Sequence, residues 1–172
     1  MNNIEKIRNL EIKFNDKDGI LSNTDIINLC KILKLNLIDC DYKDRLHNKC
    51  VDGCYIINLE SSTDGFGGSH WVALYCKNHY AVYFDSFGVA YPLELQKFTD
   101  NRIVFFNSIP IQMLDDSHCG WYCIAFLFYM VNNSGQPEII SRNFIEKFNM
   151  KNAKLNEKKL KLYIKSIFIT NF

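Results

Sequence analysis

Two features that would direct a chain to a membrane or out of the cell are missing from this sequence. No uncharged apolar run reaches about 18 residues, so we expect no transmembrane helix. The opening residues, MNNIEKIRNLEIKF, have no apolar core of the kind found in signal peptides, which argues against secretion. Internal repeats and low-complexity tracts are also absent. The sequence therefore predicts a protein that neither crosses a membrane nor is secreted.

The cysteines indicate a reducing compartment. There are seven of them, an odd number, and no signal peptide accompanies them. Free thiols are therefore a better interpretation than a disulfide framework. Cys40, Cys50 and Cys54, with His47 among them, suggest zinc, but the CVDGC spacing is not the usual two-residue knuckle and no matching pair follows. The glycine-rich stretch DGFGGS precedes a predicted strand instead of a helix, which argues against a phosphate site. We expect no metal and no other cofactor.

The composition favours one folded domain. The length of 172 residues suits a single domain, residues 1–172, and the hydrophobic content of 48% argues against disorder. The net charge of +1 is unevenly spread, because residues 142–172 carry eight Lys and Arg against two Asp and Glu. This basic C-terminal helical segment predicts a contact with DNA or another polyanion. It is also typical of a solvated helix face, the more common case. We expect a monomer.

The patterning predicts an α+β fold in which an antiparallel-rich sheet packs on helices. Residues 21–35 have helical spacing after a capping residue, Ser22 or Asn23. Residues 120–133 are apolar on all sides, as in a buried central helix. The remaining predicted elements are strands at 54–60, 70–76, 80–85 and 102–107, the middle two forming a hairpin around Lys77–His79, and helices at 137–148 and 156–169.

Cys119 is the first candidate for chemistry. It stands directly before the predicted central helix, where unpaired N–H groups and the helix dipole favour the thiolate, the nucleophilic form. Cys123, one turn later, should point into the core and stay protonated. Taken alone, Cys119 would more often be a small buried residue. The other residues of a catalytic site therefore decide between these interpretations.

A cysteine nucleophile needs a base, and four histidines are available. His118 adjoins Cys119, but neighbouring side chains diverge, so we expect an exposed loop histidine there. His79 lies in the predicted hairpin link, and His47 lies in a charged loop. His70 ends a glycine-rich loop and opens a strand, a position that can be both fixed and open to a cleft. We therefore predict that His70 is the base.

Asp85 and Gln112 extend the predicted site. If the hairpin pairs around Lys77–His79, His70 and Asp85 lie side by side at its open end. The carboxylate would then fix the tautomer of the imidazole and favour its charged form. Alone, Asp85 is equally typical of a turn in DSFG. Gln112 offers an amide on the loop into Cys119 and, with the Cys119 N–H, could stabilise an oxyanion. A lone glutamine would more often lie on the surface.

Four blocks of this sequence resemble the adenain/Ulp-type cysteine proteases. They occur in the family order within GGSHWVALY, YFDSFG and IQMLDDSHCGWYCIAFL. The resemblance runs from about Cys54 to Met130 and implies a compact, papain-like α+β domain. It also implies that Cys119 is the nucleophile, His70 the general base and acid, Asp85 its orienting acid and Gln112 the oxyanion donor. Trp71 would form a wall of the substrate groove.

The resemblance also implies a function. Members of the family cut peptide bonds after small residues, often Gly-Gly, and the adenovirus maturation protease (adenain) matures virions. The expected partners are capsid or other virion precursors, and the expected locations are the virion and the host cytoplasm or nucleus. The segment from Asp85 to Cys119 is shorter than in adenain. It also contains no cysteine before Cys119, so a disulfide-linked activating peptide is not expected there.

Other functions share parts of this pattern. A deubiquitinase or deSUMOylase would use the same site, but so short a chain shows no obvious recognition extension. Acetyltransferase effectors have the same His–acid–Cys order, yet no distinct acetyl-CoA segment is visible. A binding module without catalysis would not need all four candidate catalytic residues. Processing of precursor proteins is the leading hypothesis.

Overall fold

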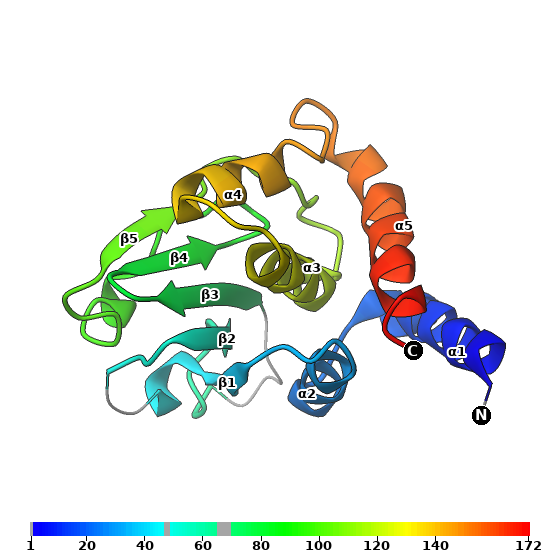
Figure 1. Cartoon of the computed structure of the whole chain (residues 1–172), viewed down its shortest axis with the longest axis horizontal. Helices are drawn as coiled ribbons and strands as arrows, with labels where there is room; N and C mark the ends of the chain where they lie inside the picture. Colours follow the sequence, from blue (N-terminus) through cyan, green and yellow to red (C-terminus); the bar gives the residue numbers. More distant parts are fainter. Residues whose placement is uncertain (1, 47–48, 65–69) are drawn as a thin grey trace.

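The computed structural model describes residues 2–46, 49–64 and 70–172. They form a compact α+β structure with five α-helices and one five-stranded sheet (Figure 1). In chain order the elements are α1 (Asn3–Asn15), α2 (Asn23–Ile32), β1 (Leu37–Tyr42), β2 (Gly53–Asn58), β3 (Trp71–Lys77), β4 (Tyr80–Phe84), β5 (Ile103–Phe106), α3 (Cys119–Asn132), α4 (Pro137–Ile145) and α5 (Asn156–Ile169). None of the described helices is long and apolar enough to cross a membrane.

The sheet is mixed, which corrects the prediction of an antiparallel-rich sheet. Its order is β1-β2-β3-β4-β5, and β2–β3 and β3–β4 are antiparallel whereas β1–β2 and β4–β5 are parallel. A parallel pair cannot be joined by a tight turn, so the chain needs a crossover connection. Residues 85–102 supply one between β4 and β5. Strand β1, which the sequence pattern did not reveal, contributes the other parallel pairing.

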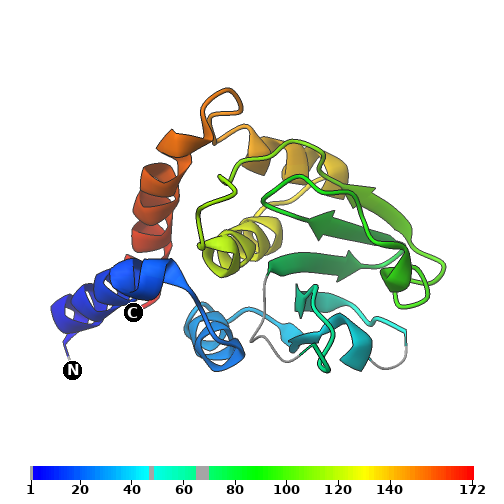
Figure 2. The same cartoon turned by 180° about the vertical axis from the view of Figure 1, so that it is seen from behind.

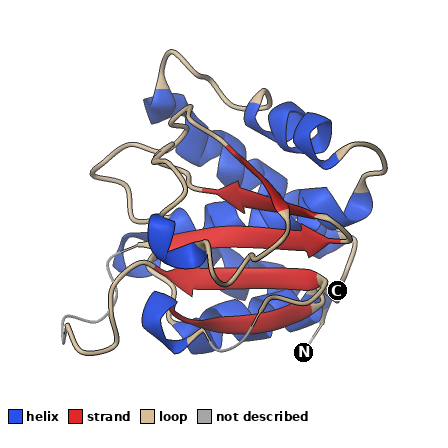
Figure 3. Cartoon of the chain, turned by 90° about the vertical axis from the view of Figure 1, so that its left-hand side faces the viewer, coloured by secondary structure: helices blue, strands red, loops and turns tan. Residues whose placement is uncertain are grey.

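The buried central helix is confirmed as α3. It lies across one face of the sheet together with α2 and α4 (Figure 3), and ten of its residues are buried. The ring of Phe126 stacks on Phe84 of β4 with centroids 4.5 Å apart, and Phe144 of α4 packs edge-on against both rings. A smaller apolar cluster, which includes Tyr83 and Leu95, covers the opposite face. This packing holds the first turn of α3 beside the ends of β3 and β4.

Two N-terminal helices complete the domain. Helix α2 begins with a capping box between Ser22 and Asp25, which decides for Ser22 between the two predicted caps. Helix α1 was not predicted, and only Leu10 and Phe14 of it are buried. It lies beside α5 in both views (Figures 1 and 2). Lys165 of α5 forms an ion pair with Glu11 of α1 at 2.7 Å, so part of the basic segment serves this contact.

Candidate active site

The β3–β4 hairpin positions the predicted base, but its register differs from the prediction. The ladder runs from Lys77 opposite Tyr80, so the turn contains two residues instead of three. Asn78 in this turn has φ +53°, and His79 is exposed as expected. Continued outward, this register sets His70 level with Phe87 instead of Asp85. The rings of His70 and Phe87 accordingly stack with centroids 4.4 Å apart.

His70 and Asp85 nevertheless meet. His70 Nε2 lies 2.9 Å from Asp85 Oδ1, because side chains two positions off a direct pair can still reach each other across two strands. The Asp85 side chain is fully buried, and its Oδ1 also accepts a hydrogen bond from the N–H of Phe87 at 2.7 Å. The carboxylate is thus fixed, and it orients the imidazole so that Nδ1 faces away from it.

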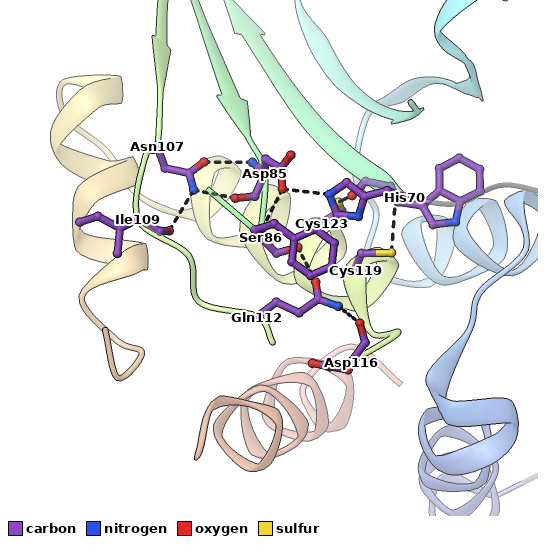
Figure 4. A network of polar contacts seen from close by, with 11 residues as sticks. His70, Asp85, Ser86, Asn107, Ile109, Gln112, Asp116, Cys119 and Cys123 are labelled. Atoms are coloured by element: carbon purple, nitrogen blue, oxygen red, sulfur yellow. Dashed lines mark hydrogen bonds and ion pairs between the residues drawn. The ribbon is translucent and has the colours of Figure 1, made fainter. Parts of the chain in front are cut away.

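Asn107 holds Asp85 from the other side and was missed by the sequence analysis. Its Nδ2 donates to the Asp85 carbonyl at 2.6 Å, and its Oδ1 accepts from the Asp85 N–H at 2.9 Å (Figure 4). The Asn107 side chain therefore makes the two backbone hydrogen bonds that a paired strand would make, at the point where β4 ends. The available signal was that the predicted strand at 102–107 ends on a polar residue, Asn107.

Replacing Asn107 with Ala is expected to lower the free energy of unfolding by about 1–3 kcal/mol, because it leaves two buried backbone groups of Asp85 unpaired. Urea unfolding measures the loss. The matched control is Asn132→Ala, which removes an exposed amide at the end of α3. Equal stability of the two variants would show that Asn107 does not hold Asp85.

Cys119 is the first residue of α3, at the end of the helix that faces His70 (Figure 4). Its Sγ lies 3.5 Å from the N–H of Trp71, and 8% of the residue is exposed. His70 Nδ1 is buried and makes no hydrogen bond within the described part of the chain. Nδ1 is therefore the ring nitrogen of His70 that is available to the Cys119 thiol.

The charge state of His70 follows from its neighbours. Burial alone would lower the pKa of His70, but the hydrogen bond with Asp85 and the interaction with the Cys119 thiol outweigh it and raise the pKa to about 9. The imidazolium form is thus favoured at neutral pH.

Cys123 has the structural role that was predicted. It is fully buried, and burial raises the pKa of its thiol well above the usual range. Its Sγ donates to the Trp71 carbonyl at 3.3 Å. One helical turn thus separates a cysteine at the helix start from a protonated cysteine in the core.

Gln112 is buried, so it is not the surface glutamine that was the alternative interpretation. Its Oε1 accepts from the Ser86 hydroxyl, and its Nε2 donates to the Asp116 carbonyl (Figure 4). A carbonyl only accepts, so the amide nitrogen must face the loop that leads into α3. An amide nitrogen carries two N–H groups, and the hydrogen bond to Asp116 uses one of them.

Trp71 lies beside the start of α3 and is partly buried. Its indole N–H donates to the Leu21 carbonyl at 3.0 Å, and a Cβ added at Gly120 would lie 3.5 Å from the indole ring. The indole is therefore held between Leu21, just before α2, and the first turn of α3. Its role as a wall of a substrate groove remains a prediction.

His118 is not the exposed loop histidine that was expected. Only 6% of it is exposed, because the end of α1 packs over its ring. Both ring nitrogens are occupied, by Asp116 and by the Phe14 carbonyl, so His118 is not placed to act as the base for Cys119. His47 and the glycines before His70 lie outside the described residues. All seven cysteines carry free thiols, and the described residues contain no group of three or more potential metal ligands.

The structure thus brings His70, Asp85, Gln112, Cys119 and Trp71 to one end of the domain, where β3 and α3 begin and β4 ends. An open hollow of about 530 Å³ adjoins Gln112, and apolar side chains including Phe87, Met113 and Leu114 line it. Neither a protein-family model nor a curated protein sequence matches this chain. The chemistry of the site must therefore be inferred from its own geometry.

Proposed function

We propose that this chain is a cysteine peptidase of the adenain/Ulp type, with a papain-like placement of the nucleophile's helix against the sheet. One observation carries the proposal. A buried imidazole is bound by a carboxylate at Nε2, while its Nδ1 is left for a cysteine at the start of a helix. A fixed acid, a base and a nucleophile in this order are the parts that covalent acyl transfer requires.

The proposed reaction begins with attack of the Cys119 thiolate on the scissile carbonyl. The tetrahedral oxyanion would be stabilised by the second N–H of Gln112 and by the backbone N–H of Cys119, which has no partner within its helix. His70 then gives its Nδ1 proton to the leaving amine. Next it takes a proton from water, and the resulting hydroxide hydrolyses the thioester.

The substrates in this proposal are precursor proteins of a virion, cut after small residues such as Gly during maturation. This part is supported by the resemblance of the sequence blocks. We propose action as a monomer in the virion and the host cytoplasm or nucleus. DNA is a candidate partner of the basic segment 142–172, although Lys161 and Lys165 are used to hold α5 against α1.

The test is incubation with the structural proteins encoded beside this chain, followed by mass spectrometry of new termini. We expect release after Gly or another small residue, with no such products from the chain carrying Cys119→Ala. Parallel reactions contain ubiquitin- or SUMO-like conjugates, and acetyl-CoA with a lysine-containing protein. Cleavage of the conjugates alone would overturn the precursor assignment, and acetyl transfer without cleavage would overturn the peptidase.

A further inference from the structure

His118 is buried between two groups that can only accept hydrogen bonds. Its Nδ1 contacts the carboxylate of Asp116, and its Nε2 lies 3.0 Å from the backbone carbonyl of Phe14 (Figure 4 shows Asp116 in the loop before α3). Both ring nitrogens must carry a proton to satisfy these two acceptors. The arrangement therefore holds His118 as an imidazolium.

The charged groups around the ring agree with this form. Asp116 lies in its own loop, Glu157 faces it from α5, and Asp115 and Lys154 line the adjoining cavity. Burial by itself would lower the pKa of His118, but Asp116, the Phe14 carbonyl and Glu157 together raise it. Lys161 lies over the ring of Phe14, on which the imidazole stacks.

The same residue links three parts of the candidate site. Asp116, which His118 binds, offers its backbone carbonyl to the amide of Gln112. The His118 carbonyl accepts hydrogen bonds from the N–H groups of Trp121 and Tyr122 and so starts α3. Phe14 belongs to the end of α1. A charged ring thus joins the proposed oxyanion donor, the nucleophile's helix and the N-terminal helix.

We propose that His118 is a positioning residue of the proposed peptidase. Its imidazolium holds the loop from Gln112 to Cys119 in the geometry that oxyanion stabilisation needs, and α1 supplies one of its two anchors. The inference rests on the proposed function and adds a requirement to it. A docked N-terminal helix is needed for a high kcat, although no residue of α1 touches Cys119 or His70 in the described contacts.

Gly19 provides a variant that disturbs His118 without altering any candidate catalytic side chain. A Cβ at this position would lie 2.1 Å from His118 Nε2, and the backbone there has φ +76°. Gly135 is the matched control, because it also has a positive φ, +139°, but a Cβ there meets nothing nearer than 3.9 Å. Gly19→Ala and Gly135→Ala therefore share backbone strain, and only the first pushes on the imidazole.

The experiment compares the two variants with the unaltered chain by kcat and KM per titrated active site. Gly19→Ala is expected to lower kcat at least tenfold with a change in KM below threefold, whereas Gly135→Ala leaves both unchanged. The alkylation rate of Cys119 should not change, because the His70–Cys119 pair is untouched. Equal kcat for the two variants, or a loss explained by fewer folded sites, would overturn the positioning role.

Nuclear magnetic resonance tests the same inference without activity. In the unaltered chain at pH 7, the ¹⁵N signals of His118 should be those of a doubly protonated ring, and the Gln112 side-chain amide signals should shift in Gly19→Ala but not in Gly135→Ala. A neutral His118, or an unmoved Gln112 amide, would overturn the proposal. If the unaltered chain cleaves no peptide while these signals behave as expected, the proposed function fails and the link from His118 to Gln112 stands.

Discussion

Replacement of Cys119 by Ala is expected to abolish peptide cleavage, with a loss of at least about 10³-fold in kcat, and to leave the fold intact. The loss follows because Cys119 is the thiol that interacts with His70, the proposed base. The fold should persist because the Cys119 sulfur accepts only a long hydrogen bond, 3.5 Å from the Trp71 N, and otherwise interacts with His70 within the candidate site. Alanine also suits the first position of a helix.

The matched control is Cys123→Ala, four residues along the same helix. Cys123 is fully buried and protonated, so its replacement should lower stability but preserve cleavage by the folded fraction. Alkylation with iodoacetamide, followed by peptide mass spectrometry, should modify Cys119 in the native chain and spare Cys123. Cleavage that survives Cys119→Ala would remove Cys119 from the mechanism. Loss of activity in both variants alike would mean that Cys119→Ala reports on folding.

Replacement of Asp85 by Asn is expected to lower kcat by about 10²–10⁴-fold. It removes the negative charge that orients the His70 ring and stabilises its imidazolium form. Asp85 has the largest effect among the groups that raise the pKa of His70, and only burial, which lowers this pKa, has a larger one. Without the carboxylate, burial dominates and the pKa of His70 falls. The variant should therefore lose the imidazolium at a lower pH than the unaltered chain, whose His70 pKa is about 9.

The same substitution should change how stability depends on pH. The pKa of His70 is higher in the folded chain than its usual 6.5, so protonation contributes stability that is fully present below about pH 6.5. This contribution, about 3 kcal/mol, is lost as the pH rises to about 9.

Urea unfolding at pH 6 and pH 9, with a pH profile of kcat, checks both expectations for Asp85. Asp41→Asn is the matched control, because its carboxylate lies on the edge strand β1, where it accepts a hydrogen bond from the Tyr42 N–H and forms a surface ion pair with Arg45. The control should keep the pH dependence of the unaltered chain. An Asp85→Asn variant with the same pH profile as the control would show that Asp85 does not set the charge of His70.

Much of the fold could be read from local patterns. The apolar run after Cys119 predicted the buried helix α3, and the β-rich runs on either side of Asn78 predicted the hairpin. These signals are strong because a helix buried on all sides and a β-strand can both be recognised from consecutive residues. Helix α1 gave no comparable signal, since only two of its residues are buried and its place depends on contacts with α5, far along the chain.

The candidate site shows the same division. The sequence by itself determined the candidate residues: a cysteine that opens a helix, a histidine just before a strand and an aspartate just after the next one. Only the tertiary structure decided how they meet. The two-residue turn shifted the register, so His70 reaches Asp85 diagonally and stacks on Phe87.

Tertiary structure also decided the roles of Asn107 and His118. Asn107, 22 residues further along the chain, makes the hydrogen bonds to the Asp85 backbone that a paired strand would make. His118 is buried because the carbonyl of Phe14, 104 residues earlier in the chain, lies within hydrogen-bonding distance of its ring. A local pattern reports the environment that a residue's near neighbours create. The position of both side chains, and the protonation of His118, depend instead on partners that only the folded chain brings to them.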